Sequence, residues 1–339
     1  MRIAINGFGR IGRTFLRTIL EDPAAIQTVE VVAINIGPAP RDSVAYAFKY
    51  DSVMGIFPAP VIVRDNELYI GDYVIPIIAE PNPEKIEWKN FGVEWVVEAS
   101  GCFTQREDAS KHIESGGAHA VLITAPAKDE DISLIPGVND HQFDLKKHKI
   151  VSLGSCTTNA LVPMLHVLHS TFAVEKGFMT TVHAYTTSQK LLDGMAKKVR
   201  RGRAAALNIV PTTTGATKVL GRVLPDLADR IGGMALRVPV ANVSLVDLVV
   251  TTKQPLNVDR IHEAYKNAIA NDMGGIIDLT MEPLVSSDFM GNNHSVVIDG
   301  LSTAVVQENT AKILGWYDNE WGYCQRLKDF FMHIVAFRK

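Results

Sequence analysis

The chain has 339 residues, of which 47% are hydrophobic and 21% are charged, and its formal net charge is −3. This length predicts about two domains with cores of their own, and it excludes a small disulfide scaffold or a disordered chain. The near balance of charge gives no electrostatic signature of a nucleic-acid partner. Since no apolar run reaches about 18 residues, we expect no membrane span or membrane partner.

The cysteines and the N-terminus indicate the compartment. Cys102, Cys156 and Cys324 form a sparse, odd-numbered set without metal-ligand spacing, so we expect free thiols and no metal site. Met1 leads straight into a strand pattern, with no sign of a targeting segment. These features predict a reducing, cytoplasmic location.

The first half of the chain alternates strand and helix patterns. Strands are predicted at 2–6, 29–35, 93–99 and 120–124, a hairpin at 61–70, and helices at 9–20, 43–50 and 107–115. The strand patterns are continuously apolar, as expected for a parallel sheet covered on both faces. We therefore predict an α/β fold with a doubly wound Rossmann domain over residues 1–155.

The second half reads as longer strands. They are predicted at 179–185, 234–240, 244–252 and 304–316, with helices at 258–272 and 327–335. This pattern predicts an α+β catalytic domain over residues 156–319 with a mostly antiparallel sheet. The C-terminal helix, about 320–339, is expected to pack back on the first domain.

The first motif is a glycine-rich turn after the first strand. Gly7, Gly9 and Gly12 form G-x-G-x-x-G immediately before a helical pattern. In a dinucleotide site these glycines permit the tight turn, the approach of a pyrophosphate and close helix packing. The phosphates then meet the free N–H groups of a helix N-terminus. A glycine turn without a ligand is the alternative.

The usual ribose anchor is missing from this motif. Dinucleotide sites commonly carry an acidic residue about 20 residues later, after the second strand. Here that stretch is Asn35-Ile36-Gly37-Pro38, without an acid. A carboxylate there would repel a 2′-phosphate, so the sequence leaves NAD and NADP both open. Arg41 is nearby, either facing a 2′-phosphate or solvated on the surface.

The second motif is Ser155-Cys156-Thr157-Thr158-Asn159, which precedes an apolar helical pattern. Cys156 is therefore expected at a helix N-terminus, where the pKa of a thiol falls from ~8.5 to about 3.5–7.5. A buried structural cysteine is the alternative, and it is the default for Cys102 and Cys324. His183, at the end of an apolar strand, is the candidate proton acceptor or else a structural histidine.

Across nearly its whole length the chain resembles glyceraldehyde-3-phosphate dehydrogenase. The resemblance lies in INGFGRIGR (5–13), KYDSVMG (49–55), TAPAKD (124–129), SCTTN (155–159), HAYTTSQ (183–189), RRGRAAALNIVPTTTGA (200–216), RVPVANVS (237–244) and WYDNEWGY (316–323). It implies that Cys156 attacks the aldehyde of glyceraldehyde 3-phosphate, while His183 lowers the thiol pKa and takes up the proton. Oxidation then gives a thioester on this cysteine, and inorganic phosphate takes up its acyl group to release 1,3-bisphosphoglycerate.

The resemblance also implies binding residues and a homotetramer. Thr186 and Arg237 match the substrate-phosphate site, and the inorganic-phosphate site is matched by Ser155, Thr157, Thr214 and Gly215, with Arg200 near the same pocket. On the NAD or NADP side the matching positions are Gly7, Gly9, Arg10, Ile11, Gly12, Asn35, Ser100, Gly101, Thr124, Asn319 and Tyr323. Ile36 and Pro81 depart from the family at the adenosine side.

Two other functions stay open from the sequence. Erythrose-4-phosphate dehydrogenase shares the cysteine and histidine but lacks the threonine matched here by Thr186. A dinucleotide-sensing protein with Cys156 as an oxidisable switch is the alternative from another class.

Overall fold

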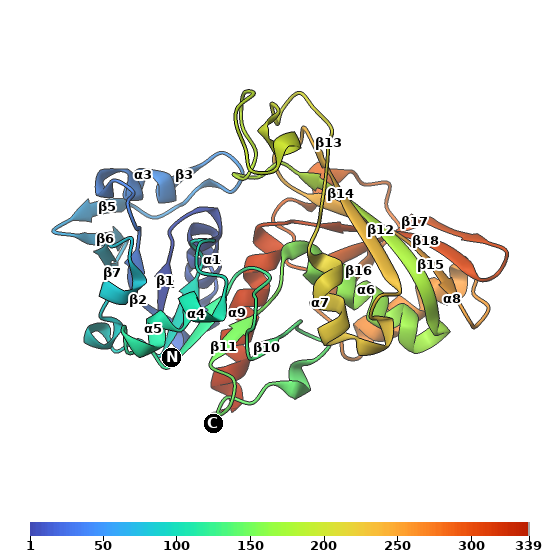
Figure 1. Ribbon diagram of the computed structural model, residues 1–339, viewed down its shortest axis with the longest axis horizontal. Coiled ribbons are helices and arrows are strands. Elements are labelled where there is room, and N and C mark those ends of the chain that lie inside the picture. Colours follow the sequence, from blue (N-terminus) through green and yellow to red (C-terminus); the bar gives the residue numbers. More distant parts are fainter. Residues whose placement is uncertain (338–339) are drawn as a thin grey trace. The chain divides into compact units, whose positions relative to one another are not determined.

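The computed structural model describes residues 1–337, which form two compact units (Figure 1). The first unit contains residues 1–134, 141–154 and the segment from Cys324 onward, and the second contains residues 135–140 and 155–323. Each unit is built on one large sheet, and the predicted α/β class is confirmed. Residues 338 and 339 of the predicted C-terminal helix lie outside the described residues.

The sheet of the first unit has nine strands in the order β10-β11-β9-β8-β1-β2-β7-β6-β5. Their bounds are β1 (Arg2–Asn6), β2 (Glu30–Asn35), β5 (Val61–Arg64), β6 (Glu67–Ile70), β7 (Tyr73–Ile78), β8 (Trp95–Glu98), β9 (Ala120–Ile123), β10 (Ile132–Ser133) and β11 (Ile150–Ser152). Pairing is parallel from β10 to β7, as predicted, and antiparallel from β7 to β5. In the β5–β6 hairpin Asp65 and Asn66 have φ of 54° and 64°, which suits a two-residue turn.

The helices of the first unit differ from the predicted pattern in two places: the helix at Pro23–Thr28 was not predicted, and the one predicted at 107–115 is divided. They are α1 (Arg10–Leu20), α2 (Pro23–Thr28), α3 (Val44–Lys49), α4 (Arg106–Ala109), α5 (Lys111–Glu114) and α9 (Trp321–Phe337), which begins in the second unit; a short ribbon joins β3 (Tyr50–Asp51) to β4 (Gly55–Ile56). The single helix predicted at 107–115 is wrong, because the chain breaks at Ser110 into α4 and α5. In α9, Phe331 contacts Phe15 of α1, and Phe330 meets Trp95 of β8 edge-on.

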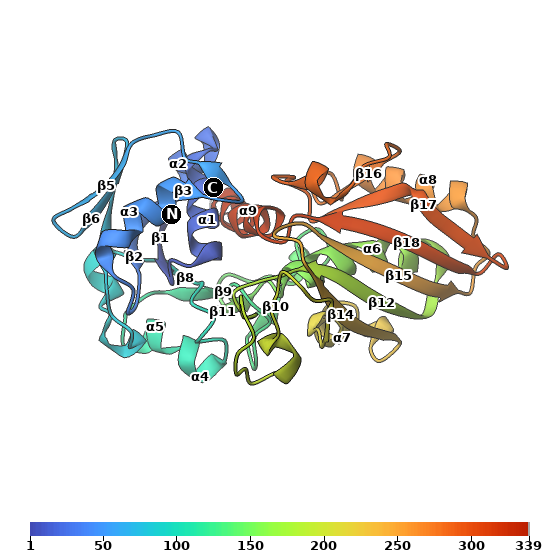
Figure 2. The ribbon, with the colours of Figure 1, turned by 90° about the horizontal axis from the view of Figure 1, so that it is seen from above.

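The sheet of the second unit has seven strands in the order β13-β14-β12-β15-β18-β17-β16 (Figure 2). Their bounds are β12 (Val174–Ala184), β13 (Val210–Thr212), β14 (Ile231–Val238), β15 (Ser244–Thr252), β16 (Ile277–Thr280), β17 (Val296–Val306) and β18 (Thr310–Tyr317). Only β12·β14 and β16·β17 are parallel, so the predicted mostly antiparallel sheet is confirmed. The single strand predicted at 304–316 is wrong: Gln307 and Glu308, with φ of 52° and 57°, turn the chain between β17 and β18.

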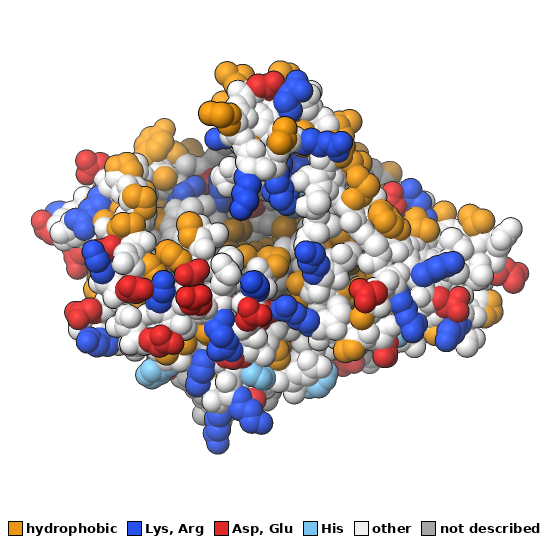
Figure 3. Space-filling model, viewed as in Figure 1, with side chains coloured by type: hydrophobic (Ala, Val, Ile, Leu, Met, Phe, Trp, Pro, Cys, Tyr) orange, Lys and Arg blue, Asp and Glu red, His pale blue; other side chains and the backbone are white. Residues whose placement is uncertain are grey.

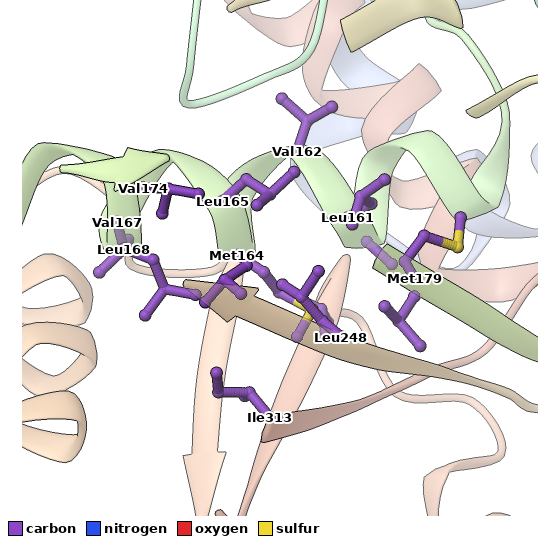
Figure 4. Close-up of a cluster of buried hydrophobic side chains, with 14 of the residues drawn as sticks. Leu161, Val162, Met164, Leu165, Val167, Leu168, Val174, Met179, Leu248 and Ile313 are labelled. Atoms are coloured by element: carbon purple, nitrogen blue, oxygen red, sulfur yellow. The ribbon is translucent and has the colours of Figure 1, made fainter. Parts of the chain in front are cut away.

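The core of the second unit is centred on α6 (Cys156–Phe172). Figure 4 shows Leu161, Met164, Leu165 and Leu168 of this helix among Met179, Leu248 and Ile313 of the sheet. The other helices of this unit are α7 (Ala216–Val223) and α8 (Val258–Ala270). Burial of α6 along its length fixes the position of its N-terminus, where Ser155 and Cys156 lie.

Candidate active site

Cys156 is the first residue of α6, as predicted. Ser155 is the N-cap, and its hydroxyl accepts a hydrogen bond from the Thr158 N–H at 3.1 Å. The Thr158 side chain bonds back to the Ser155 backbone, which completes a capping box. The thiol therefore lies at a rigid, capped helix start.

His183 lies next to this thiol. Its Nε2 is 3.6 Å from the Sγ of Cys156, and its side chain is almost completely buried near the end of β12. Arg237 is the register partner of His183 on β14. The sheet thus places a nucleophile, an imidazole and a guanidinium together within the second unit.

The groups around Nδ1 decide what the imidazole can do. Nδ1 is 2.7 Å from the carbonyl oxygen of Ala184, and Nη1 of Arg237 is 2.6 Å from both Nδ1 and that oxygen. If Nδ1 donates to Ala184, the lone pair of Nε2 faces the thiol; if Nδ1 accepts from Arg237, Nε2 carries the proton instead. The Ala184 carbonyl therefore supports the tautomer that can accept a proton from sulfur.

The electrostatics of the pair differ from the sequence expectation of a lowered thiol pKa. Burial raises the pKa of the Cys156 thiol, although the charge of Arg237 and the Thr157 N–H oppose this shift. Burial, and next the charge of Arg237, lower the pKa of His183 to about 3. A neutral imidazole exerts no charge that would stabilise a thiolate, so Arg237 and the Thr157 N–H are the groups that favour the ionised sulfur.

A cluster of cations surrounds the pair. Burial lowers the pKa of Arg237 and of Arg201, and for Lys198 the charges of Arg201, Lys218 and Arg237 add to that effect. No Asp or Glu within the described residues forms an ion pair with Arg201 or Arg237, and Nε of Arg237 is buried without a partner. Uncompensated guanidinium groups are the typical ligands of phosphate.

Arg201, which the sequence analysis missed, belongs to this cluster, whereas the predicted Arg200 is exposed. Nε of Arg201 donates to the Thr212 hydroxyl at 3.0 Å, and Nη1 donates to the Ser188 hydroxyl at 3.2 Å. That hydroxyl is 3.0 Å from the Thr186 hydroxyl, so the predicted Thr186 joins the network. Both arginines lie in a short 3₁₀ turn at Val199–Gly202, and only its geometry separates their environments.

Thr214 and Gly215 precede α7. Gly215 is the N-cap of this helix, which has no acidic residue in its first turn and no side-chain cap. The Thr214 hydroxyl accepts a hydrogen bond from the Ala216 N–H at 3.2 Å. A helix start without a carboxylate favours an anion, and the phosphate-binding role of Thr214 and Gly215 stays a prediction.

Tyr317 is a second residue that the sequence analysis missed. Its buried hydroxyl lies 2.9 Å from Oγ1 of Thr157 and 2.8 Å from Oγ1 of Thr181, and its ring meets the His183 ring edge-on. Burial raises its pKa, so it stays a neutral phenol. The Thr157 hydroxyl, predicted at the inorganic phosphate, is engaged in this bridge between α6 and the sheet.

A separate cleft of about 670 Å³ lies within the first unit, at the carboxyl ends of β1, β2 and β8. The predicted Gly7, Gly9, Asn35 and Ser100 line it, together with the departing residues Ile36 and Pro81. Of the other predicted cofactor residues, Arg10, Ile11, Gly12, Gly101 and Thr124 are in this unit but outside the lining, and Asn319 and Tyr323 belong to the second unit.

The glycine turn of this cleft fits a dinucleotide. A Cβ on Gly7, whose φ is +96°, would lie 2.3 Å from the Ser100 nitrogen, and one on Gly12 would lie 2.2 Å from the Gly7 oxygen. A Cβ on Gly9 would meet nothing within 4 Å. The first turn of α1 has no acidic residue and no side-chain cap, so its N–H groups face the space that Gly9 leaves open.

Residues 1–337 contain no group of three or more His, Cys, Asp or Glu side chains arranged to hold a metal ion. Their helices are all too short or too polar to span a bilayer.

A dinucleotide-type α/β unit and a second unit with a cysteine–histidine pair among cations define the class of NAD(P)-dependent dehydrogenases that use a thiol nucleophile. Residues 1–106 match the model of the glyceraldehyde 3-phosphate dehydrogenase NAD binding domain, and residues 155–319 match that of its C-terminal domain. The chain belongs to the glyceraldehyde-3-phosphate dehydrogenase family.

Curated relatives cover almost the whole chain. Glyceraldehyde-3-phosphate dehydrogenase 2 of Bacillus subtilis is 44% identical, covering 99% of this chain and 97% of the relative. The corresponding protein of Geobacillus stearothermophilus is 46% identical over 99% and 98%. A Nostoc glyceraldehyde-3-phosphate dehydrogenase 2 is 43% identical over 97% of each chain.

Proposed function

We propose that this chain oxidises D-glyceraldehyde 3-phosphate with NAD(P) and inorganic phosphate to 1,3-bisphosphoglycerate. Membership of the family makes it an oxidoreductase that acts on an aldehyde group with NAD(P). The observation that carries the proposal is the 3.6 Å approach of Cys156 Sγ to His183 Nε2, beside arginines without a counter-ion. This arrangement suits a substrate that offers both an electrophilic carbonyl and a phosphate.

The mechanism begins with proton transfer from sulfur. Sγ of Cys156 attacks the aldehyde carbon while Nε2 of His183 takes the thiol proton and then returns it to the carbonyl oxygen, which gives a thiohemiacetal. Bound NAD(P) supplies the hydride acceptor for the oxidation. His183 takes the hydroxyl proton as the thiohemiacetal becomes a thioester. An oxygen of inorganic phosphate then attacks the acyl carbon, the C–S bond breaks, and the sulfur regains a proton.

The negative charge of a bound substrate changes the pKa of His183. The positive charge of Arg237 contributes to the low pKa of His183 in the free site. A phosphate anion beside Arg237 offsets that charge, and the pKa of His183 rises toward its ordinary value. Substrate binding thus improves the imidazole as a proton acceptor at the moment when the thiol must lose its proton.

The cofactor assignment includes both NAD and NADP, with weak discrimination between them. Ile36, Gly37 and Pro38 form the cleft wall where a ribose-binding acid is usual, and none of them repels a 2′-phosphate. Glu80 also lines the cleft, and its Oε1 accepts a hydrogen bond from the Asn82 N–H at 2.9 Å. This bond holds its carboxylate within its own loop.

The variant Cys156→Ser tests the reaction. We expect turnover to fall by at least about 1,000-fold, because a serine hydroxyl beside a neutral imidazole is a far weaker nucleophile. NAD affinity, measured by titration calorimetry, should stay within about twofold. Cys102→Ser, at an exposed cysteine of the first unit, is the matched control for turnover only, because Cys102 also lines the cleft. Phosphate-dependent turnover that survives in Cys156→Ser would overturn the proposal.

The expected homotetramer has support in an exposed apolar segment. Leu191, Leu192, Met195, Val199 and Leu207 are each at least 74% exposed in the loop before β13. This loop stands at the top of Figure 1, where orange side chains gather in Figure 3. Apolar surface of this kind is typical of interfaces. Mass photometry should find tetramers, and Met195→Glu should shift the population toward smaller species; a monomeric wild type would refute the assembly.

A further inference from the structure

The first unit contains a fully buried carboxylate that the mechanism does not use. Glu98 ends β8, directly behind the cleft, and its side chain has no exposed surface. Its Oε1 accepts hydrogen bonds from the N–H and hydroxyl of Ser100. Its Oε2 accepts one from Nδ2 of Asn6 at 2.5 Å and faces Nε2 of His112 at 3.1 Å. Burying a carboxylate without a cation beside it costs free energy. Hydrogen bonds from all the surrounding donors are needed to offset that cost.

His112 has a defined proton position in this cluster. Trp88 Nε1 can only donate, and it donates to Nδ1 of His112 at 3.0 Å. The proton of the neutral ring therefore lies on Nε2 and points at Glu98. All groups that face Glu98 are donors. The carboxylate, which can only accept, therefore fixes which atom of each neighbouring side chain points toward it.

The orientation that Glu98 imposes is transmitted to the cleft wall by the hydrogen bonds of two asparagines. Because Asn6 presents its NH₂ to Glu98, its Oδ1 is left to accept from Nδ2 of Asn35 at 2.6 Å. Asn35 then presents its Oδ1 to the backbone N–H groups of Gly37 at 3.2 Å and Glu80 at 3.0 Å. The relay crosses the ends of β8, β1 and β2 and ends at the turn where the usual ribose-binding acid is missing.

We propose that Glu98 is a positioning residue for the dinucleotide: through Asn6 and Asn35 it clamps Gly37 and Glu80, which line the ribose end of the cleft. This inference rests on the proposed use of NAD(P). It explains how the wall keeps one shape without an acidic side chain at Ile36. The carboxylate acts from beneath the cleft, where it imposes no charge repulsion on a 2′-phosphate at the surface.

Glu98→Gln breaks the relay while it keeps the shape of the side chain. A glutamine has one oxygen and one NH₂, so either orientation sets its NH₂ against a donor, namely Ser100 on one side or His112 and Asn6 on the other. If Asn6 turns over to accept from the glutamine, its NH₂ faces the NH₂ of Asn35, which the Glu80 carbonyl and the Gly37 and Glu80 N–H groups hold in its orientation. If Asn35 turns as well, its NH₂ faces those N–H groups. Each outcome loosens the wall or leaves buried donors opposed.

The test uses the full chain with NAD as the probe. We expect the Kd for NAD of Glu98→Gln to rise about tenfold, with kcat at saturating NAD within about twofold. Asn6→Leu should show the same loss, and the double variant should lose no more than either single one, because both cut one relay. Trp88→Phe is the matched control: it removes the His112 partner on the far side of Glu98, and its NAD affinity should be unchanged.

A second measurement does not depend on cofactor binding. Hydrogen exchange of the Gly37 and Glu80 amides should accelerate about tenfold or more in Asn6→Leu and Glu98→Gln, but not in Trp88→Phe. If Glu98→Gln fails to fold, Asn6→Leu still decides by this readout. Unchanged exchange at both amides, or equal NAD loss in Trp88→Phe, overturns the relay. A wild type that does not bind NAD refutes the proposed function instead, even if the exchange result holds.

Discussion

The two units differ in the groups that they offer to a bound anion. Behind the cleft of the first unit the buried carboxylate of Glu98 is satisfied by four donors, and the open glycine turn leaves backbone N–H groups for the pyrophosphate. In the second unit no carboxylate of residues 1–337 pairs with Arg201 or Arg237. A cofactor that must leave after each turnover meets backbone N–H groups and the single guanidinium of Arg13, which lines the cleft. A substrate whose charge must change the chemistry meets the guanidinium groups of Arg201 and Arg237 together. The comparison predicts that charge removal hurts the second unit most.

After the loss of the nucleophile in Cys156→Ser, the largest effect is expected from Arg201→Leu. Loss of this uncompensated guanidinium should raise the KM for the phosphorylated aldehyde or for inorganic phosphate by roughly 10–100-fold. Arg200→Leu is the matched control, since its side chain is exposed, and its kinetic constants should stay within about threefold. Steady-state kinetics of both variants decide the point. An equal loss in both would show that total charge matters rather than the position of Arg201.

The same pair shows what sequence patterns can predict. The glycine turn and the helix start at Cys156 are local features, and the structure has both. The choice between Arg200 and Arg201 depends on which side chain a short 3₁₀ turn directs toward Thr212, a contact that no periodicity encodes. Asn6 and Glu98 are 92 residues apart, so their bond follows from strand order alone.

The direction of the pKa shift of the Cys156 thiol could not be predicted from the sequence either. A helix N-terminus lowers the pKa of a thiol, but Cys156 packs partly buried against the core of the second unit, and this desolvation raises its pKa. Tyr317 was missed because its contacts to Thr157 and Thr181 join segments from three parts of the chain. Tertiary packing therefore sets the direction of the thiol pKa shift and the contacts of Tyr317.

The next effect concerns stability in acid. The folded pKa of His183 is about 3, below its ordinary value of 6.5, so the unfolded chain binds the extra proton between these values. Stability from this group is complete above pH 6.5 and is lost as pH falls, by about 2 kcal/mol between pH 7 and pH 5. His183→Asn should show a smaller fall in Tm than the wild type over that interval. Identical falls would place the acid sensitivity elsewhere.

A smaller effect is expected from Tyr317→Phe, which keeps the ring and removes only the hydroxyl. Thr157 and Thr181 then lose their bridge, and the start of α6 is held less firmly to the sheet. We expect kcat to fall by about tenfold with little change in the Kd for NAD. Tyr265→Phe, at a buried tyrosine bonded to the Met164 carbonyl, controls for the loss of a buried hydroxyl. A fall confined to Tm in both variants would remove Tyr317 from the positioning of Cys156.

The smallest effect is expected from Glu80→Gln, which tests whether charge matters for cofactor choice in the first unit. Glu80 is the only acid among the residues that line the cleft within the described chain, and Oε1 is held by the Asn82 N–H. Glu80→Gln keeps this bond and removes the charge, so kcat/KM for NADP should rise a few-fold, as expected for a charge pair separated by water. The value for NAD should not change, because NAD carries no 2′-phosphate. A rise of 100-fold or more would mean that Glu80 serves as the missing ribose-binding acid, and the first unit would then discriminate by charge as the second one does.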